Sequence, residues 1–391
     1  MPAAEAWKFI ILVGVVSLFS DMTYEGARSI TGPFLGSLNA SATVVGIVAG
    51  LGEFIGYALR LASGYLTDRL GKYWSITFVG YALNLFAVPL LALAGNWQLA
   101  AFLMVMERLG KAIRTPARDA MLSHATAAVG RGWGFGFHEA MDQIGAMLGP
   151  LIVALVLYLK GGYRAGFAYL LIPAVLALVV IAIAARLYPH PQHLEVSAVK
   201  LETGGFRRPY WLYVAAVGLI GAGYADFPLI AFHFGKVAVV PANWIPLFYA
   251  VAMGVDAVAA LILGRLFDRL GMPVIMAVSI LAAFFAPLVF LGGFDLALWG
   301  MALWGIGMGA QESVIKAALA EMVPRERRAT GYGMFNTGFG LFWFLGSALM
   351  GILYDFSLGA LIAFSMVAQL AAIPLFFLVS RELGRIKPQA A

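Results

Sequence analysis

The sequence has no cysteine and little charge. Without Cys among its 391 residues, it offers no disulfide framework, no thiol nucleophile and no thiolate metal site. Charged residues make up 12% of the chain and hydrophobic residues 62%, whereas an ordinary soluble domain is about 25% charged. These shortages exclude a soluble globular protein and indicate a polytopic membrane protein, whose partner is the lipid bilayer.

The basic residues do not form a nucleic-acid surface, although the net charge is +6. They lie between hydrophobic segments, which is typical of membrane topology, so we expect no nucleic-acid partner. The first residues run straight into an apolar segment without a small-residue cleavage site. We therefore expect no removable signal peptide.

Hydropathy predicts twelve membrane helices, at about 20 apolar residues per crossing. The expected crossings are 8–34, 42–66, 73–94, 97–117, 132–157, 165–187, 209–233, 243–266, 273–292, 296–320, 330–353 and 359–380. Alternate loops hold most of the Lys and Arg residues. The positive-inside rule then places both termini in the cytoplasm of a multi-pass cell (inner) membrane protein.

The longest polar stretch divides the chain into two halves of six helices. We expect an N-terminal bundle at 1–187, a cytoplasmic linker at 188–208, a C-terminal bundle at 209–380 and a cytoplasmic tail at 381–391. The linker is too short to form a domain of its own.

An internal repeat supports this division. GYLTDRLGK at 64–72 recurs as GRLFDRLGM at 264–272, after the second helix of each half. The repeated positions are Gly64, Asp68, Arg69 and Gly71, and Gly264, Asp268, Arg269 and Gly271. Parallel repeats of this kind describe a transporter architecture.

With twelve crossings, a six-plus-six repeat and two such loops, the chain resembles the major facilitator superfamily. The resemblance implies an all-α fold of two pseudo-symmetric bundles, alternating access, a small-molecule substrate and a monomer. It also implies that the two Asp-Arg loops latch the halves in the outward-facing state. In the fifth helix, Gly145, Gly149 and Pro150 resemble a G-x-x-x-G-P motif carried by proton-coupled exporters of that family.

Charges inside the first helix point to the transport site. Asp21, Tyr24, Glu25 and Arg28 fall within a stripe about 100° wide, so this face must look into protein or water. Each charge at mid-membrane costs about 2.5–3.5 kcal/mol on insertion scales. Because two nearby carboxylates disfavour being ionised together, the pattern predicts a proton-binding site. A structural ion cluster that pins this helix to its neighbours is the alternative.

Other buried charges extend the candidate site. Glu53, Arg108, Glu139, Asp142 and Asp226 are further candidates for contacts with substrate or proton, because intramembrane ionisable residues are functional by default. We expect Asp226 to line a locally irregular helix, since a proline follows two residues later.

Two features of the fourth and fifth helices have simpler interpretations. Arg114 and Arg118 approach the expected end of the fourth helix, so we expect them to snorkel to the surface. Gly145 and Gly149 share a stripe with His138 and Asp142, so we expect this face to pack closely on another helix.

Acids outnumber bases within the expected crossings. The nine acids are Asp21, Glu25, Glu53, Glu107, Glu139, Asp142, Asp226, Asp256 and Glu312, and the six bases are Arg28, Arg60, Arg108, Lys111, Arg114 and Lys316. Three acids are thus left to hold a proton or a cationic ligand. The excess favours proton coupling and a cationic or zwitterionic cargo.

Three transport hypotheses follow. The first is a proton-coupled antiporter that exports a small organic cation, drug or amphiphile, with no cofactor and H⁺ as coupling ion. The second is proton symport or exchange of an anionic organic solute at Arg28, Arg108 and Lys111. The third, a divalent metal-ion carrier, would use Asp21, Glu25, His138 or His233. We expect no enzyme, because no nucleophile–base constellation or phosphate-binding loop occurs.

Overall fold

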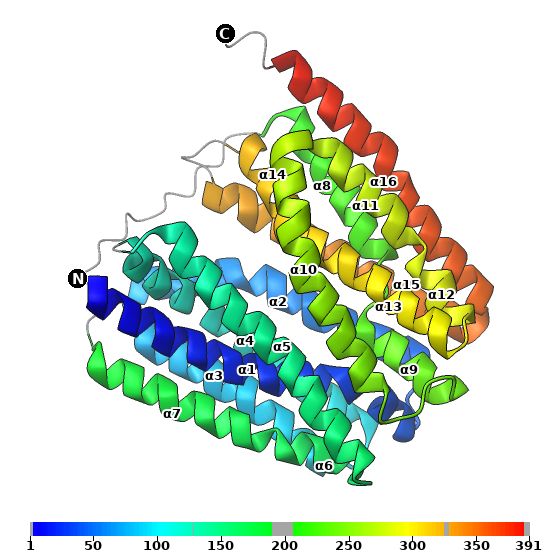
Figure 1. The fold of residues 1–391 in the computed structure, drawn as a ribbon, viewed down its shortest axis with the longest axis horizontal. Coiled ribbons are helices and arrows are strands. Elements are labelled where there is room, and N and C mark those ends of the chain that lie inside the picture. Colours follow the sequence, from blue (N-terminus) through cyan, green and yellow to red (C-terminus); the bar gives the residue numbers. More distant parts are fainter. Residues whose placement is uncertain (1–2, 128, 190–205, 324–327, 387–391) are drawn as a thin grey trace. The chain divides into compact units, whose positions relative to one another are not determined.

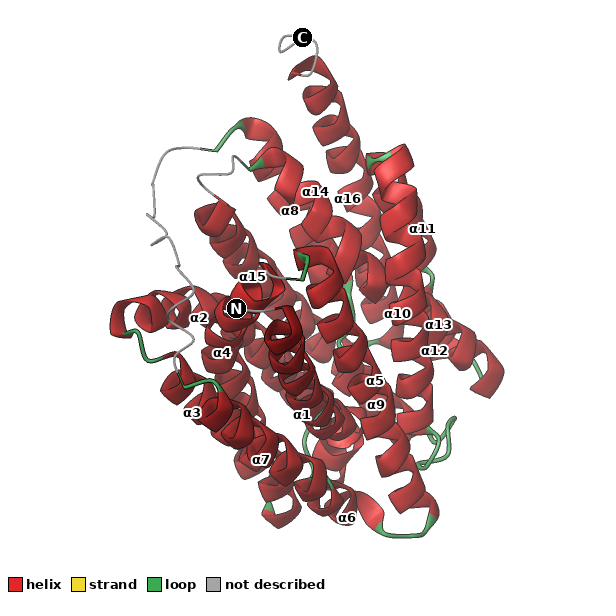
Figure 2. Cartoon of the chain, turned by 60° about the vertical axis from the view of Figure 1, so that its left-hand side comes forward, coloured by secondary structure: helices red, strands yellow, loops and turns green. Residues whose placement is uncertain are grey.

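The structure is a computed structural model that describes residues 3–127, 129–189, 206–323 and 328–386. Within these ranges every regular element is a helix and no strand occurs (Figures 1 and 2). Most of the predicted linker, and the last residues of the predicted tail, lie outside the described residues.

The predicted crossings correspond to helices throughout the described ranges. Single helices form seven of them: α1 (Ala3–Ser37), α2 (Ala42–Leu70), α4 (Trp97–Ala127), α5 (Arg131–Tyr158), α10 (Ile245–Leu270), α15 (Arg328–Phe356) and α16 (Leu358–Ile386). Consecutive pieces form the others: α3 (Tyr73–Leu90) with η1 (Leu91–Leu93), α6 (Gly162–Tyr169) with α7 (Leu171–Leu187), α8 (Arg208–Gly223) with α9 (Phe227–Val237), α11 (Met272–Ala283) with α12 (Phe285–Leu291), and α13 (Phe294–Gly309) with the π-helical turn η3 (Ala310–Val314) and α14 (Ile315–Met322).

Ten of these segments are long and apolar enough to cross a membrane, counted over the described residues. The two that fall short are α4 and the α13–η3–α14 segment, which carry charged or polar residues in their middle parts. The prediction of an all-α membrane fold is confirmed.

The chain forms two compact units. Unit 1 comprises Met1–Asn39, Ile55–Ala198 and Pro241–Ala250, and unit 2 comprises Ala40–Phe54, Val199–Val240 and Val251–Ala391. Both α2 and α10 are therefore shared between the units. The predicted bundle boundaries, 1–187 and 209–380, stay a prediction, because the units follow contacts and not the sequence repeat.

Glycines bring α1 and α5 of unit 1 together. A Cβ on Gly149 would lie 2.8 Å from the backbone nitrogen of Gly26, and one on Gly145 would lie 3.1 Å from the Cβ of Asp21. Such approach is possible only without side chains at these positions. The prediction that this face of the fifth helix packs closely on another helix is confirmed.

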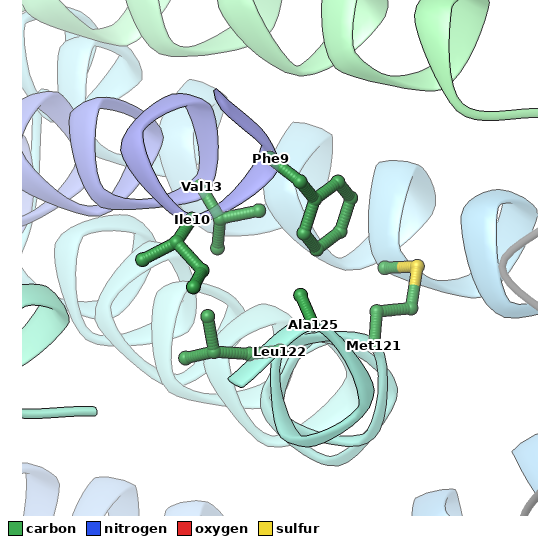
Figure 3. Packing of buried hydrophobic residues seen from close by; sticks show 6 residues of the cluster. All are labelled: Phe9, Ile10, Val13, Met121, Leu122 and Ala125. Carbon is green, nitrogen blue, oxygen red and sulfur yellow. The ribbon is translucent and has the colours of Figure 1, made fainter. Parts of the chain in front are cut away.

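Helix α4 is longer than the sequence suggested. The crossing was expected to end at residue 117, but α4 continues through Pro116 to Ala127. Its last turns pack on the first turns of α1 in a buried apolar cluster (Figure 3). The cluster consists of Phe9, Ile10, Val13, Met121, Leu122 and Ala125. This apolar contact stabilises the part of α4 that lies beyond residue 117, where the predicted crossing ended.

Each of the two repeated turns contains a glycine with a positive φ. Gly71 follows α2 with φ 63°, and Gly271 follows α10 with φ 68°. Their amides donate to the carbonyls of Thr67 and Phe267, at 2.9 and 2.8 Å respectively. A positive φ favours glycine, because glycine has no Cβ. The side chain of Asp68 lies outside the described residues, whereas Arg69, Asp268 and Arg269 are exposed.

In unit 2, the first turn of α2 is held by an acid from α15. Asp355 accepts hydrogen bonds from the backbone nitrogens of Ala42 and Thr43, at 3.3 and 2.8 Å, and from Thr43 Oγ1 at 2.8 Å. Further along, a Cβ on Gly50 would lie 3.0 Å from the Cα of Phe344. A side-chain cap and close glycine packing thus fasten the start of α2 to α15.

Candidate functional site

The polar stripe of α1 is buried in unit 1. Asp21, Tyr24, Glu25 and Arg28 are each no more than 9% exposed, and they occupy the middle of a helix that runs from Ala3 to Ser37. The prediction that this face looks into the protein is confirmed. The stripe is the first component of the candidate site.

Helix α4 adds cations that lie on aromatic rings. The ammonium nitrogen of Lys111 lies 3.9 Å from the ring centroid of Tyr24. The guanidinium carbon of Arg114 lies 4.3 Å from the ring centroid of Tyr81, a residue of α3, and 5.9 Å from that of Tyr24. All three contacts have the geometry of cation–π interactions. Asp21 lies within electrostatic range of Lys111 and Arg114.

Arg114 does not snorkel as predicted. It is 1% exposed, and its Nε and Nη1 have no hydrogen-bond partner in the described part of the chain. It lies 13 residues before the end of α4, which is about 20 Å at the helical rise of about 1.5 Å per residue. The prediction was wrong because it placed the end of the helix at residue 117.

Arg108 has an acidic neighbour of its own. Its Nε lies 3.2 Å from Oε2 of Glu107, and Glu107 Oε1 accepts a hydrogen bond of 2.7 Å from Asn84 Nδ2. The Glu107 charge is therefore largely compensated within α3 and α4. Lys111 lies within electrostatic range of Arg108, Glu25 and Asp21, so these charges belong to one polar layer.

A tyrosine from α10 completes this layer. Tyr249, which is 1% exposed, donates a hydrogen bond of 2.5 Å to Oε2 of Glu25. Both residues belong to unit 1, because that unit includes Pro241–Ala250. Sequence reasoning missed Tyr249, since a Tyr in an apolar helix carries no signal of its partner.

A second polar group joins α1, α4 and α5. Ser17 Oγ lies 2.8 Å from His138 Nε2, and His138 Nδ1 lies 3.6 Å from Asp142 Oδ2. Arg118 Nη1 donates to Ser17 Oγ at 3.1 Å, and Arg118 Nη2 lies 2.8 Å from Asp119 Oδ1. The guanidinium of Arg118 is therefore bonded to partners within unit 1. Ser17 was not predicted.

Three further candidates from the sequence are Glu139, Glu53 and Asp226. Glu139 is exposed, whereas Glu53 and Asp226 are buried in unit 2. The helix breaks between Gly223 and Phe227, and Asp226 occupies the extended position before α9, so the predicted irregularity is confirmed. Trp343 Nε1 donates to Asp226 Oδ2 at 3.3 Å.

No group of three acidic or His side chains that could hold a metal ion occurs among the described residues. The ligands proposed for a metal carrier are divided, since His233 belongs to unit 2 and the others to unit 1. His233 Nδ1 is instead paired with the hydroxyl of Tyr354 at 3.0 Å.

Helical membrane crossings, repeated Asp-Arg turns and a buried charged layer are typical of a membrane transporter. Residues 13–347 match the sequence profile of the Major Facilitator Superfamily. The chain therefore belongs to this family and is a secondary transporter with a small-molecule substrate.

Its relatives span almost the whole chain. The uncharacterized protein Rv2265 of Mycobacterium tuberculosis is 40% identical, over 99% of this chain and 96% of that protein. The uncharacterized MFS-type transporter MJ1317 of Methanocaldococcus jannaschii is 27% identical, over 90% of each.

Solved structures of transporters have a similar fold. The nucleoside transporter NupG, in a mutant form, has a TM-score of 0.77 at 12% identity, and the match covers 94% of this chain and 100% of that chain. A bacterial homologue of the human lysosomal transporter Spinster has a TM-score of 0.73 at 16% identity, over 95% and 96% of the two chains. At such low identity these likenesses concern the fold alone.

Proposed function

We propose that this secondary transporter is proton-coupled and that its cargo is an anionic organic solute, bound at Arg114 in unit 1. The cargo class is that of the second hypothesis from the sequence, which placed the anion at Arg28, Arg108 and Lys111 and not at Arg114. The observation that carries it is the buried guanidinium of Arg114, two of whose nitrogens lack hydrogen-bond partners among the described residues.

A buried cation with unsatisfied donors is unfavourable and calls for an anionic partner. A guanidinium also presents its donors in a planar fork that matches a carboxylate or phosphate. Arg114 already rests on the face of Tyr81, so its orientation is fixed before cargo arrives. An anionic group of the cargo would complete its hydrogen bonds.

The aromatic rings of this layer argue against a cationic cargo at the same place. An organic cation is bound well by an aromatic face beside a carboxylate. Here Lys111 lies over Tyr24 and Arg114 over Tyr81. A cationic cargo would have to displace one of the protein's own cations from its ring.

Proton coupling would arise from the acids beside Arg114. Both Asp21 and Asp142 lie within electrostatic range of Arg114. While these carboxylates are ionised they compensate the guanidinium, and a proton on one of them leaves more positive charge for the cargo. Anion binding would therefore take up protons, and it is expected to tighten as the pH falls.

The test is the thermal stability of the purified protein with benzoate, citrate and phosphate as anions and tetraethylammonium and tetraphenylphosphonium as cations. A ligand at about 100 times its Kd adds about 2.7 kcal/mol. For 391 residues this raises Tm by about 3 °C, at an unfolding entropy of about 2.1 cal/mol/K per residue. We expect stabilisation by an anion, stronger at about pH 6 than at about pH 8.

Arg114→Gln should abolish this stabilisation, while Arg208→Gln should not. Arg208 is the matched control because its side chain is 77% exposed at the start of α8. Anion stabilisation that survives Arg114→Gln would contradict the assignment of the site.

The export of an organic cation, the first hypothesis from the sequence, has one observation in its favour. In unit 2 the carboxylate of Asp226 contacts Trp343, whose ring centroid lies 5.9 Å from that of Tyr224 and 5.4 Å from that of Phe339. Stabilisation by the two cations, stronger at about pH 8, would favour this function over anion transport.

The proposed setting is an inner-membrane monomer with both termini in the cytoplasm. The support is the distribution of Lys and Arg, which concentrates in the loops on the side of the termini. We propose H⁺ as the coupling ion and no cofactor.

A further inference from the structure

Two helices related by the sequence repeat divide between the units in the same manner. The turn at 264–272 repeats the turn at 64–72, so α10 is the counterpart of α2. The first part of α2, Ala40–Phe54, belongs to unit 2, and the segment before and at the start of α10, Pro241–Ala250, belongs to unit 1. The start of each helix thus belongs to a different unit from the rest of that helix.

The two dockings differ in chemistry. The start of α2 is held by backbone amides and a threonine hydroxyl that donate to Asp355. The start of α10 is held by the Tyr249 hydroxyl, which donates to Glu25. Glu25 lies in the buried charged layer of unit 1, whereas Asp355 is exposed. Only the α10 docking is therefore part of the proposed transport site.

A hydrogen bond to an ionised acceptor is about twice as strong as one between neutral groups. The Tyr249–Glu25 bond therefore depends on the charge of Glu25. The charged groups around Glu25 include Asp21 of α1 and Lys111 of α4. Arg28 of α1 and Arg108 of α4 lie within electrostatic range of Tyr249.

We propose that Tyr249 is a positioning residue that holds Pro241–Ala250 on unit 1 while Glu25 is ionised, and releases it when Glu25 loses its charge. The hydroxyl thereby links the charge state of the site to the position of α10. The inference rests on the proposed function only in taking Glu25 as a group whose charge changes during transport.

The absence of natural cysteine permits a direct test. Ala250, which is 4% exposed, is replaced by Cys in the full chain, and its rate of labelling by N-ethylmaleimide is measured. Tyr249→Phe removes only the hydroxyl, and Glu25→Gln removes only the charge. Tyr249→Phe should raise the labelling rate at least about tenfold, the factor expected for loss of a hydrogen bond to a charged group. Glu25→Gln leaves a weaker, neutral acceptor, so it should raise the rate by less.

The double variant separates a link through Glu25 from a general structural role. If Tyr249 acts through Glu25, Tyr249→Phe with Glu25→Gln labels no faster than the faster single variant. Additive increases would overturn the proposal. Glu25→Asp, which retains the charge, should label more slowly than Glu25→Gln, and equal rates would also contradict it.

Tyr213→Phe is the matched control. Tyr213 is a fully buried tyrosine of α8 in unit 2, whose hydroxyl donates to the Ile315 carbonyl at 2.7 Å. Its change should leave labelling at position 250 unaltered. The labelling needs no cargo, so it remains interpretable if no anion binds. An anion effect at Arg114 with unchanged labelling in Tyr249→Phe would overturn this inference alone.

Discussion

Removing the carboxylate of Asp355 should loosen the start of α2. The side chain caps the first backbone amides of that helix and also binds the Thr43 hydroxyl. Loss of such a cap costs about 0.5–2 kcal/mol, and loss of a negative charge at a helix N-terminus about 0.3–1 kcal/mol. Because Asp355 is exposed, solvent screening reduces the charge contribution. We therefore expect a loss of about 1–2 kcal/mol.

The assay is the labelling of a cysteine placed at Val45, which is fully buried on α2. A loss of about 1–2 kcal/mol corresponds to an increase of about 5–30-fold in the open population. Asp355→Ala should accelerate labelling by this factor. Asp355→Asn should have a smaller effect, since its amide oxygen can still accept one hydrogen bond.

Asp295→Ala is the control, because Asp295 is an exposed acid in the first turn of α13. If Asp355→Ala labels no faster than Asp295→Ala, the cap does not hold the start of α2. Glycine packing between α2 and α15 would then be sufficient.

Two further predictions concern glycines. Gly149→Leu should reduce the yield of folded protein and lower Tm, because a Cβ at this position would already lie 2.8 Å from the Gly26 nitrogen and overpacking costs about 1–3 kcal/mol. Gly136→Leu, on the same helix but with open space around it, should have little effect. Equal effects of the two changes would contradict close α1–α5 packing. Gly71→Ala should lower the free energy of unfolding by about 1 kcal/mol in a denaturant series, because φ is 63° at this position. Gly95→Ala is the control, since the added Cβ meets no atom within 4 Å. An unchanged midpoint in Gly71→Ala would show that the turn tolerates a side chain.

The sequence alone predicted the fold class and the polar face on which the candidate site is built. Hydrophobic runs report directly on burial in a bilayer, so the crossings could be located without contacts. The stripe of Asp21, Tyr24, Glu25 and Arg28 was visible because neighbouring turns of one helix lie on one face. The face of Gly145 and Gly149 was visible for the same reason.

Only the tertiary structure decided which residues meet. Arg114 was expected to snorkel because the fourth crossing was predicted to end at residue 117, whereas packing against α1 accompanies a helix that continues to Ala127. Tyr249 meets Glu25 across 224 positions of the chain, and Ser17 meets His138 across 121. Periodicity along one helix determines which face is polar, but the partner of that face depends on how helices distant in sequence pack together.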